Sequence, residues 1–139
     1  MEDCIFCKIV RGEIPCYKVY EDDEVLAFLD ISQTTKGHTL VIPKEHFQNM
    51  LYCPKDLLAK VMGVAQHIAQ AQVASLGANG VNVLINTNEV AGQTVMHFHV
   101  HVIPRYSGED CLRLEFLSNK IDHLSLPAIA DEIIKKSGN

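Results

Sequence analysis

Three histidines, His97, His99 and His101, occupy alternate positions of one apolar run inside GQTVMHFHVHVIPR, which spans residues 92–105. Successive side chains of a β-strand point to opposite faces. A strand here would therefore place the three imidazoles on one face and the intervening apolar side chains in a core. An ordinary exposed strand would more often carry Thr, Lys or Glu, so the row of imidazoles indicates a functional site.

Two chemistries can use such a row. Two histidines at i and i+2 can share a catalytic zinc that keeps an open position, or one imidazole can attack phosphorus while its neighbours bind the phosphate oxygens. Gly92, Gln93 and Thr94 precede the row, and this composition suits a loop whose donors approach an oxyanion. No carboxylate stands between residues 90 and 108 to serve a metal as ligand or base. The pattern favours a nucleophilic histidine, which must be neutral and held in one tautomer by an acceptor at its second ring nitrogen.

The elements that must position these residues can be predicted from periodicity and turn signals. Alternating apolar patterns predict strands over residues 17–21, 25–30, 38–43, 81–86 and 96–104. Helical patterns predict a short helix over 5–11, a long one that begins at 54–56 and ends at Gly77, and a last one from Leu126 to Lys136. We expect Ser125 and Gly138 to cap the last helix. Hairpins around one main helix indicate an α+β fold with a mostly antiparallel sheet.

Length and charge restrict the function classes. The chain has 139 residues and a net charge of −5, and its Lys and Arg residues form no cluster beyond Lys135–Lys136. One domain is expected at this length, and a long nucleic acid is not expected as a partner because such binding needs a basic face. No run is long enough to span a membrane, and the acidic start shows no signal peptide. Five cysteines without such a signal indicate a reducing compartment, so we expect a cytoplasmic protein.

Cys4 and Cys7 form a C-x-x-C pair for which zinc binding, redox chemistry and coincidence compete. The redox interpretation is weak because no thioredoxin-like strand precedes the pair. A closed tetrahedral zinc needs two further ligands. His46 is a candidate, and the three-histidine row offers the fourth.

The run GQTVMHFHVHVIPR resembles the signature of the histidine triad (HIT) family. The resemblance continues through FCKIVRGEIP, FLDISQ and KGHTLVIPKEH in the same order. It is closest to the small bacterial branch near the Hint phosphoramidases that carries a zinc-binding cysteine pair, and weaker to the Fhit dinucleoside hydrolases. This implies a HIT-like fold for residues 1–139 as a single domain, with a core at about 4–106 and a variable tail at 107–139. It also implies a homodimer.

The resemblance further implies a reaction. His99 would attack the α-phosphate of a purine nucleotide and form a nucleotidyl-histidine that water cleaves. His101 would bind the phosphate and assist the leaving group, and His38 would be the fourth family histidine. The implied substrate contacts are Asp30 at the ribose, Asn86, Gln93 and Thr94 at the phosphate, and Phe6, Ile9, Phe28, Ile31 and Leu40 around the base. The implied ligands of one structural zinc per chain are Cys4, Cys7, His46 and His97.

The substrate stays open at this stage. Phosphoramidates lead, because Fhit-like members lack the cysteine pair Cys4 and Cys7. The related uridylyltransferases have Gln where this chain has His101, so the third histidine favours hydrolysis over transfer to a sugar phosphate. A dinucleoside polyphosphate is the alternative. Two other classes remain: a zinc hydrolase with His97, His99 and a third group around one catalytic metal, and a nucleotide-binding module.

Overall fold

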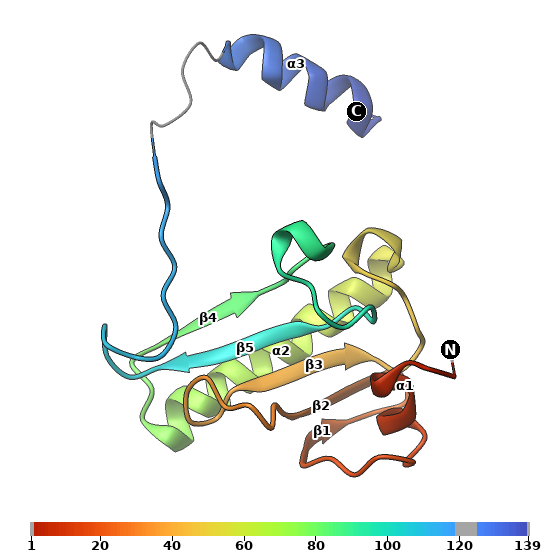
Figure 1. The fold of residues 1–139 in the computed structure, drawn as a ribbon, viewed down its shortest axis with the longest axis vertical. Coiled ribbons are helices and arrows are strands. Elements are labelled where there is room, and N and C mark those ends of the chain that lie inside the picture. The colour runs from red at the N-terminus through yellow and green to blue at the C-terminus, as the bar shows by residue number, and fades with distance from the viewer. Residues whose placement is uncertain (1, 119–124, 139) are drawn as a thin grey trace.

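The computed structural model describes residues 2–118 and 125–138 (Figure 1). Its centre is a five-stranded antiparallel sheet with the spatial order β1-β2-β3-β5-β4. The strands are β1 Lys18–Glu21, β2 Val25–Leu29, β3 Thr39–Pro43, β4 Gly80–Leu84 and β5 Val100–Arg105. The predicted α+β class and antiparallel sheet are confirmed.

The predicted helices are confirmed with boundaries close to those expected. They are α1 Ile5–Val10, α2 Lys55–Leu76 and α3 Leu126–Ser137. Gly77 and Gly138 end α2 and α3 in the left-handed conformation, and the Ser125 hydroxyl accepts from Ala128 N. Short 3-10 turns lie at Met50–Tyr52 and Glu89–Ala91. None of the helices in the described ranges is long and apolar enough to cross a membrane.

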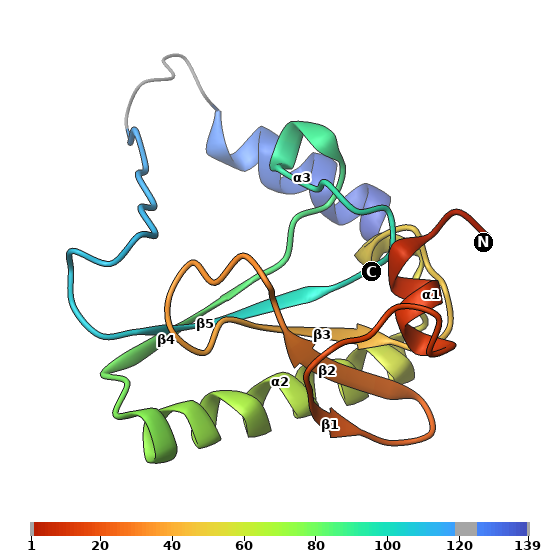
Figure 2. The same cartoon turned by 60° about the horizontal axis from the view of Figure 1, so that its bottom comes forward.

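The sheet separates two apolar clusters, and α2 runs across one of its faces (Figure 2). On the α2 side, residues such as Val41, Val100 and Val102 pack against the helix. On the opposite side Leu26, Phe28, Leu40 and Ile42 pack with Phe6 and Ile9 of α1. Leu40 pairs with His101 across β3 and β5, so His101 belongs to the α1 side of the sheet.

One strand prediction is wrong in part, because β5 begins at Val100 and not at residue 96. The β3–β5 ladder pairs Val41 with Val100, and the same register would place Pro43 opposite Phe98. Pro43 has no N–H to donate, so the ladder cannot continue. Phe98 N instead donates to Phe47 O at 2.7 Å. Only His101 of the three histidines lies on the strand, and the side chain of Phe98 still enters the core as expected.

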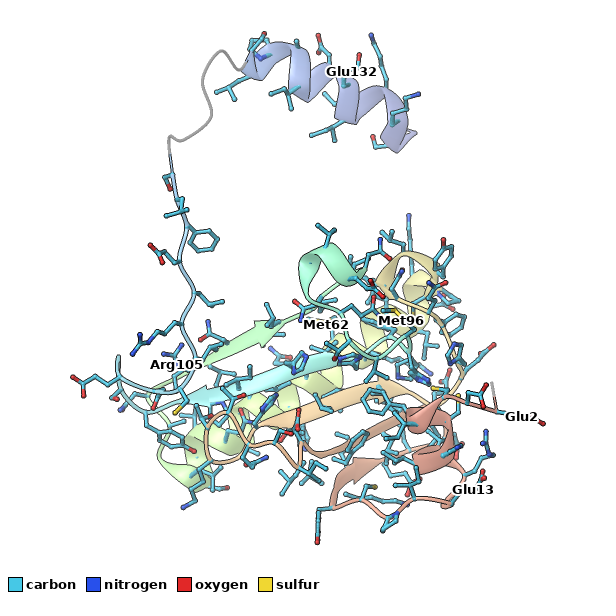
Figure 3. All side chains as sticks on the ribbon, in the orientation of Figure 1. Glu2, Glu13, Met62, Met96, Arg105 and Glu132 are labelled. Atoms are coloured by element: carbon cyan, nitrogen blue, oxygen red, sulfur yellow. The ribbon has the colours of Figure 1, made fainter. Side chains whose placement is uncertain are left out.

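After β5 the chain forms an extended arm that leads away from the sheet (Figure 3, where Arg105 is labelled near its start). The Arg105 guanidinium fixes the start of the arm by donating to Asn82 Oδ1 at 2.7 Å, Asp110 Oδ2 at 3.1 Å and Leu112 O at 3.1 Å. All residues of α3 are exposed. The predicted tail also includes residues 119–124 and 139, which lie outside the described residues.

Candidate active site and metal site

His99 lies just before β5 and is only 6% exposed. Its Nδ1 is 2.7 Å from the main-chain oxygen of His97. A carbonyl oxygen can only accept, so Nδ1 carries the proton and Nε2 keeps its lone pair in the neutral ring. Burial lowers the pKa of His99, against the opposing effects of this hydrogen bond and of Asp30. The structure thus presents a neutral imidazole with an unprotonated Nε2, the form that a nucleophile requires.

A second chain of hydrogen bonds fixes the tautomer of His101. Thr34 N donates to His38 Nδ1 at 3.3 Å, so the proton of His38 sits on Nε2. His38 Nε2 lies 2.9 Å from His101 Nδ1 and donates to it. His101 therefore carries its own proton on Nε2. Burial, followed by the nearby His99 and His38, lowers the pKa of His101 to about 4, and the ring centroids of His99 and His101 are 5.0 Å apart.

Asp30 follows β2 and uses its two carboxylate oxygens differently. Oδ1 accepts from Ser32 N at 2.8 Å, which is the turn role that an Asp before Ser commonly has. Oδ2 lies 3.7 Å from His38 Nε2. The second oxygen is thus directed toward the histidine cluster, and Asp30 joins His38 and His101 at one place.

The predicted phosphate-side residues lie in the segment between β4 and β5. They differ in exposure and in the hydrogen bonds that they already make within the protein. Thr94 is exposed, and Asn86 Nδ2 donates to Gly92 O at 3.5 Å. Gln93 is 2% exposed, and its amide is fully used by main-chain groups. Its Oε1 accepts from Asn88 N at 2.7 Å, and its Nε2 donates to Gln48 O at 2.7 Å and Val95 O at 3.0 Å. Gln93 therefore braces the loop, while Thr94 and Asn86 are available to a ligand.

The five residues expected to wall a base divide into two groups. Phe6, Ile9, Phe28 and Leu40 are buried in the apolar cluster beneath α1. Phe6 meets His99 edge to face with ring centroids 5.2 Å apart, so this cluster adjoins the candidate nucleophile. Ile31 lies outside the cluster on the turn after β2 and is 87% exposed.

Cys4, Cys7, His46 and His97 come together from three separate segments, and their ligating atoms all lie within 4.8 Å of one another. His97 Nδ1 is 3.4 Å from Cys4 Sγ, 3.6 Å from Cys7 Sγ and 3.2 Å from His46 Nδ1. Cys7 Sγ is 3.4 Å from His46 Nδ1. The four residues can therefore hold one metal ion.

These separations fit a tetrahedral zinc. Zn–N bonds of about 2.0–2.1 Å and Zn–S bonds of about 2.3 Å give tetrahedral edges of about 3.3 Å between nitrogens and about 3.6 Å between nitrogen and sulfur. His97 also has the second hydrogen bond that metal-bound histidines commonly make, because its Nε2 lies 2.8 Å from Pro43 O. Burial lowers the pKa of His97 to about 4, so Nδ1 is available as a ligand at neutral pH.

The arrangement separates the roles of His97 and His99. His97 Nδ1 faces the cysteines, whereas His99 Nδ1 faces the His97 carbonyl. Among the described residues, the two groups that could hold a metal are the cysteine–histidine set and Asp30 with His38 and His101, and neither includes His99. A zinc shared by His97 and His99 therefore has no support in this geometry.

Sequence reasoning missed the main-chain groups of the site. The carbonyls of Pro43 and His97 and the N–H of Thr34 fix the tautomers of three histidines. A main-chain acceptor leaves no signal in residue type. Arg105 was also given no role, although a charged side chain that directly follows an apolar strand is a reasonable candidate for an anchor.

Comparison with known proteins gives one consistent family. The family model for the HIT domain matches residues 11–108. Protein hit of Bacillus subtilis (strain 168) is 52% identical over 109 residues, which cover 78% of this chain and 75% of that protein. Adenosine 5′-monophosphoramidase hnt1 of Schizosaccharomyces pombe is 41% identical over 133 residues, with 96% and 97% covered. Adenylylsulfatase HINT3 of Arabidopsis thaliana is 43% identical over 110 residues, which cover 79% of this chain and 55% of that protein.

Solved structures agree with this result. A HIT family protein from Bacillus anthracis has a TM-score of 0.92 and 47% identity, and the match covers 97% of both chains. A Zn-bound histidine triad family protein from Mycobacterium smegmatis has a TM-score of 0.77 and 40% identity, with 86% of both chains covered.

Proposed function

This chain belongs to the HIT (histidine triad) family, and from this premise we propose that it is a nucleotide hydrolase acting through a nucleotidyl-histidine intermediate. The proposed substrates are purine nucleoside 5′-phosphoramidates or related nucleotides. The observation that carries the proposal is the 2.7 Å contact between His99 Nδ1 and His97 O. It leaves His99 Nε2 as an unprotonated nucleophile in a buried, neutral ring.

In the first half of the reaction, His99 Nε2 forms a bond to the α-phosphorus while the bond from phosphorus to the leaving nitrogen breaks. The leaving nitrogen takes the proton from His101 Nε2, and the positive charge that develops on His99 balances this loss. In the second half, water attacks phosphorus, the bond to His99 breaks, and a proton of the water returns to His101. Both histidines thus regain their starting forms, as a general acid and base must.

The surrounding residues then have distinct roles in the proposal. Asp30 binds the ribose hydroxyls through Oδ2, since Oδ1 is held by Ser32 N. Thr94 and Asn86 bind phosphate oxygens, and Gln93 acts by bracing their loop. The base lies against the apolar cluster that contains Phe6, Ile9, Phe28 and Leu40, and the exposed Ile31 covers it from the side of the turn.

Two other features of the protein belong to the same proposal. The cysteine–histidine set holds one structural zinc per chain, since four protein ligands leave no open position. The chain forms a homodimer, which would cover apolar surface that a monomer leaves in water. That surface includes Leu126, Ile129 and Ile133 of α3 and Val73 of α2. Sedimentation of the purified protein should give twice the mass of one chain, and the mass of one chain would contradict the dimer.

The substrate class is open to one competing proposal. The named relatives include an adenosine 5′-monophosphoramidase and an adenylylsulfatase, so an adenylyl group with a leaving sulfate is a second candidate. Both substrates share the adenylylated histidine and differ only in the leaving group. A dinucleoside polyphosphate is a third candidate.

The test supplies adenosine 5′-phosphoramidate, adenosine 5′-phosphosulfate and a diadenosine polyphosphate in parallel and follows AMP release. Intact-mass measurement should show an adenylylated wild-type chain and none in a His99→Ala variant. The control is His67→Ala, which removes an exposed histidine of α2 and should keep full activity. Turnover by His99→Ala within about tenfold of wild type, or about 1.4 kcal/mol of barrier, would contradict the assignment of the nucleophile.

A further inference from the structure

His97 is the residue through which the metal site and the candidate nucleophile meet. It is fully buried, and three of its polar atoms have different partners. Nδ1 faces the thiols of Cys4 and Cys7, Nε2 faces Pro43 O at 2.8 Å, and the main-chain oxygen faces His99 Nδ1 at 2.7 Å. The group that fixes the tautomer of His99 therefore belongs to a metal ligand.

The sheet does not hold this part of the backbone. The β3–β5 ladder ends at the pair Val41–Val100, so residues 97–99 lie beyond it. The main-chain tie in this segment is Phe98 N to Phe47 O at 2.7 Å, and Phe47 directly follows the ligand His46. Besides the core packing of Phe98, the position of the His97 carbonyl thus depends on the side chain of His97 and on the segment that carries His46.

We propose that metal occupancy positions the nucleophile. An ion bound by Cys4, Cys7, His46 and His97 ties α1 and the segment after β3 to the residues just before β5. This fixes the His97 carbonyl at the distance that keeps the proton of His99 on Nδ1. His97 is in these terms a positioning residue, which acts through its main chain on the catalytic histidine while its side chain binds the metal.

The competing explanation is a metal that stabilises the fold as a whole and has no special relation to His99. The two explanations differ in where the effect of metal loss appears. Local positioning predicts a change at His99 while the sheet and α2 persist, because the apolar cluster between the sheet and α2 contains none of the four residues of the metal site. Global stabilisation predicts either no change at His99 or unfolding of the whole chain.

The experiment uses the zinc-loaded full chain labelled with 15N at histidine. Zinc per chain is measured by mass spectrometry before and after treatment with a chelator, and His99 is assigned by its absence from His99→Asn. The loaded protein should show one His99 tautomer with the proton on Nδ1. The metal-free protein should show a mixture of tautomers and unchanged far-UV circular dichroism. Zinc loss that leaves the His99 signals unchanged, or that unfolds the chain, would overturn the proposal.

Two variants test the same coupling without a chelator. Cys7→Ser should lose zinc and the single His99 tautomer, while Cys53→Ser, which also alters a buried cysteine, should keep both. His46→Cys preserves four ligands and should keep the His99 signature when loaded with zinc. Loss of the signature in loaded His46→Cys would contradict the coupling.

The coupling between the metal and His99 can hold whether or not the proposed function is right. Only the expected effect on reaction rate rests on the proposed function. Metal loss should lower kcat for AMP release at least tenfold with a smaller change in KM, because Asp30, the proposed ribose contact, is not part of the metal site. The tautomer is read without substrate. A wild-type chain that releases no AMP would contradict the proposed function. His99 signals that do not change when zinc is removed would contradict the coupling.

Discussion

His38 Nε2 lies 2.9 Å from His101 Nδ1, and this contact joins the residue before β3 to strand β5. Because Thr34 N occupies His38 Nδ1, the contact has one direction, from His38 to His101. The proton on His101 Nε2 is its consequence. In the proposed mechanism, two histidines that look equivalent in the sequence therefore have different roles: His101 donates to the substrate, and His38 orients His101.

His101→Gln should separate substrates by their leaving group. A phosphoramidate nitrogen needs a proton to depart, so its hydrolysis should slow by about 10²- to 10⁴-fold, the usual contribution of a general acid. A p-nitrophenyl ester of AMP releases p-nitrophenolate, a stable anion that needs no proton to depart, and its hydrolysis should stay within about tenfold of wild type. The measurement is kcat/KM for both substrates. Equal losses on the two substrates would show that His101 does not act as the acid.

The pH dependence of stability should also report His101. Its pKa is lowered to about 4 in the folded chain from an ordinary value of 6.5. Between these values the unfolded chain binds the extra proton, so the stabilisation is complete above about pH 6.5 and is lost as the pH falls toward 4. The expected contribution to the slope is at most about 1.4 kcal/mol per pH unit.

The measurement is urea unfolding of zinc-loaded protein at several pH values between 4 and 7. His101→Gln should flatten the dependence of the free energy of unfolding on pH. Comparison at equal zinc content removes the pH dependence of metal binding, which both proteins share. Parallel curves for wild type and His101→Gln would refute the prediction.

Gln93 and Thr94 are adjacent, but their variants should change different properties. Gln93→Ala should lower the stability of the fold, whereas Thr94→Ala should weaken substrate binding. Gln93→Ala leaves three partly buried main-chain partners without their hydrogen bonds, so it should lower the free energy of unfolding by about 1–3 kcal/mol. Thr94→Ala removes an exposed hydroxyl and should leave stability within about 0.5 kcal/mol while raising KM. Chemical unfolding and steady-state kinetics of the two variants check both expectations. A Thr94→Ala variant with normal KM would remove Thr94 from the phosphate site.

Much of the fold could be predicted from periodicity, since the strands and all three helices were found within a few residues. The exception is informative. Residues 96–102 alternate without interruption, yet the ladder begins only at Val100. The reason lies in the partner strand, where Pro43 cannot donate, and a single strand read by itself does not reveal its partner.

The candidate site could be predicted as a set of residue types, but its geometry could not. The sequence indicates four metal-binding side chains and a cluster of histidines. It does not indicate that the main-chain carbonyl of His97, a candidate metal ligand, accepts a hydrogen bond from His99. Nor does it indicate that the Gln93 side chain already bonds to main-chain groups. Such contacts depend on where the backbone passes, which residue types do not encode at these positions.

Gly37→Ala tests the link between backbone geometry at this end of β3 and catalysis. Gly37 has a φ of +99°, and an added Cβ would lie 2.5 Å from Leu76 Cδ1 and 3.3 Å from Pro104 Cγ. Strain and overlap should lower the free energy of unfolding by about 1–3 kcal/mol. Because His38 is the next residue, kcat should fall as well.

The matched control for this substitution is Gly63→Ala in α2, where an added Cβ meets no heavy atom within 4 Å. Alanine in a helix interior is better than glycine by about 0.5–1 kcal/mol, so this variant should be more stable and fully active. Urea unfolding and AMP release are measured for both variants. A Gly37→Ala protein with wild-type stability would mean that Leu76 and the backbone yield at no cost. Normal stability together with reduced kcat would instead place the whole effect on the orientation of His38.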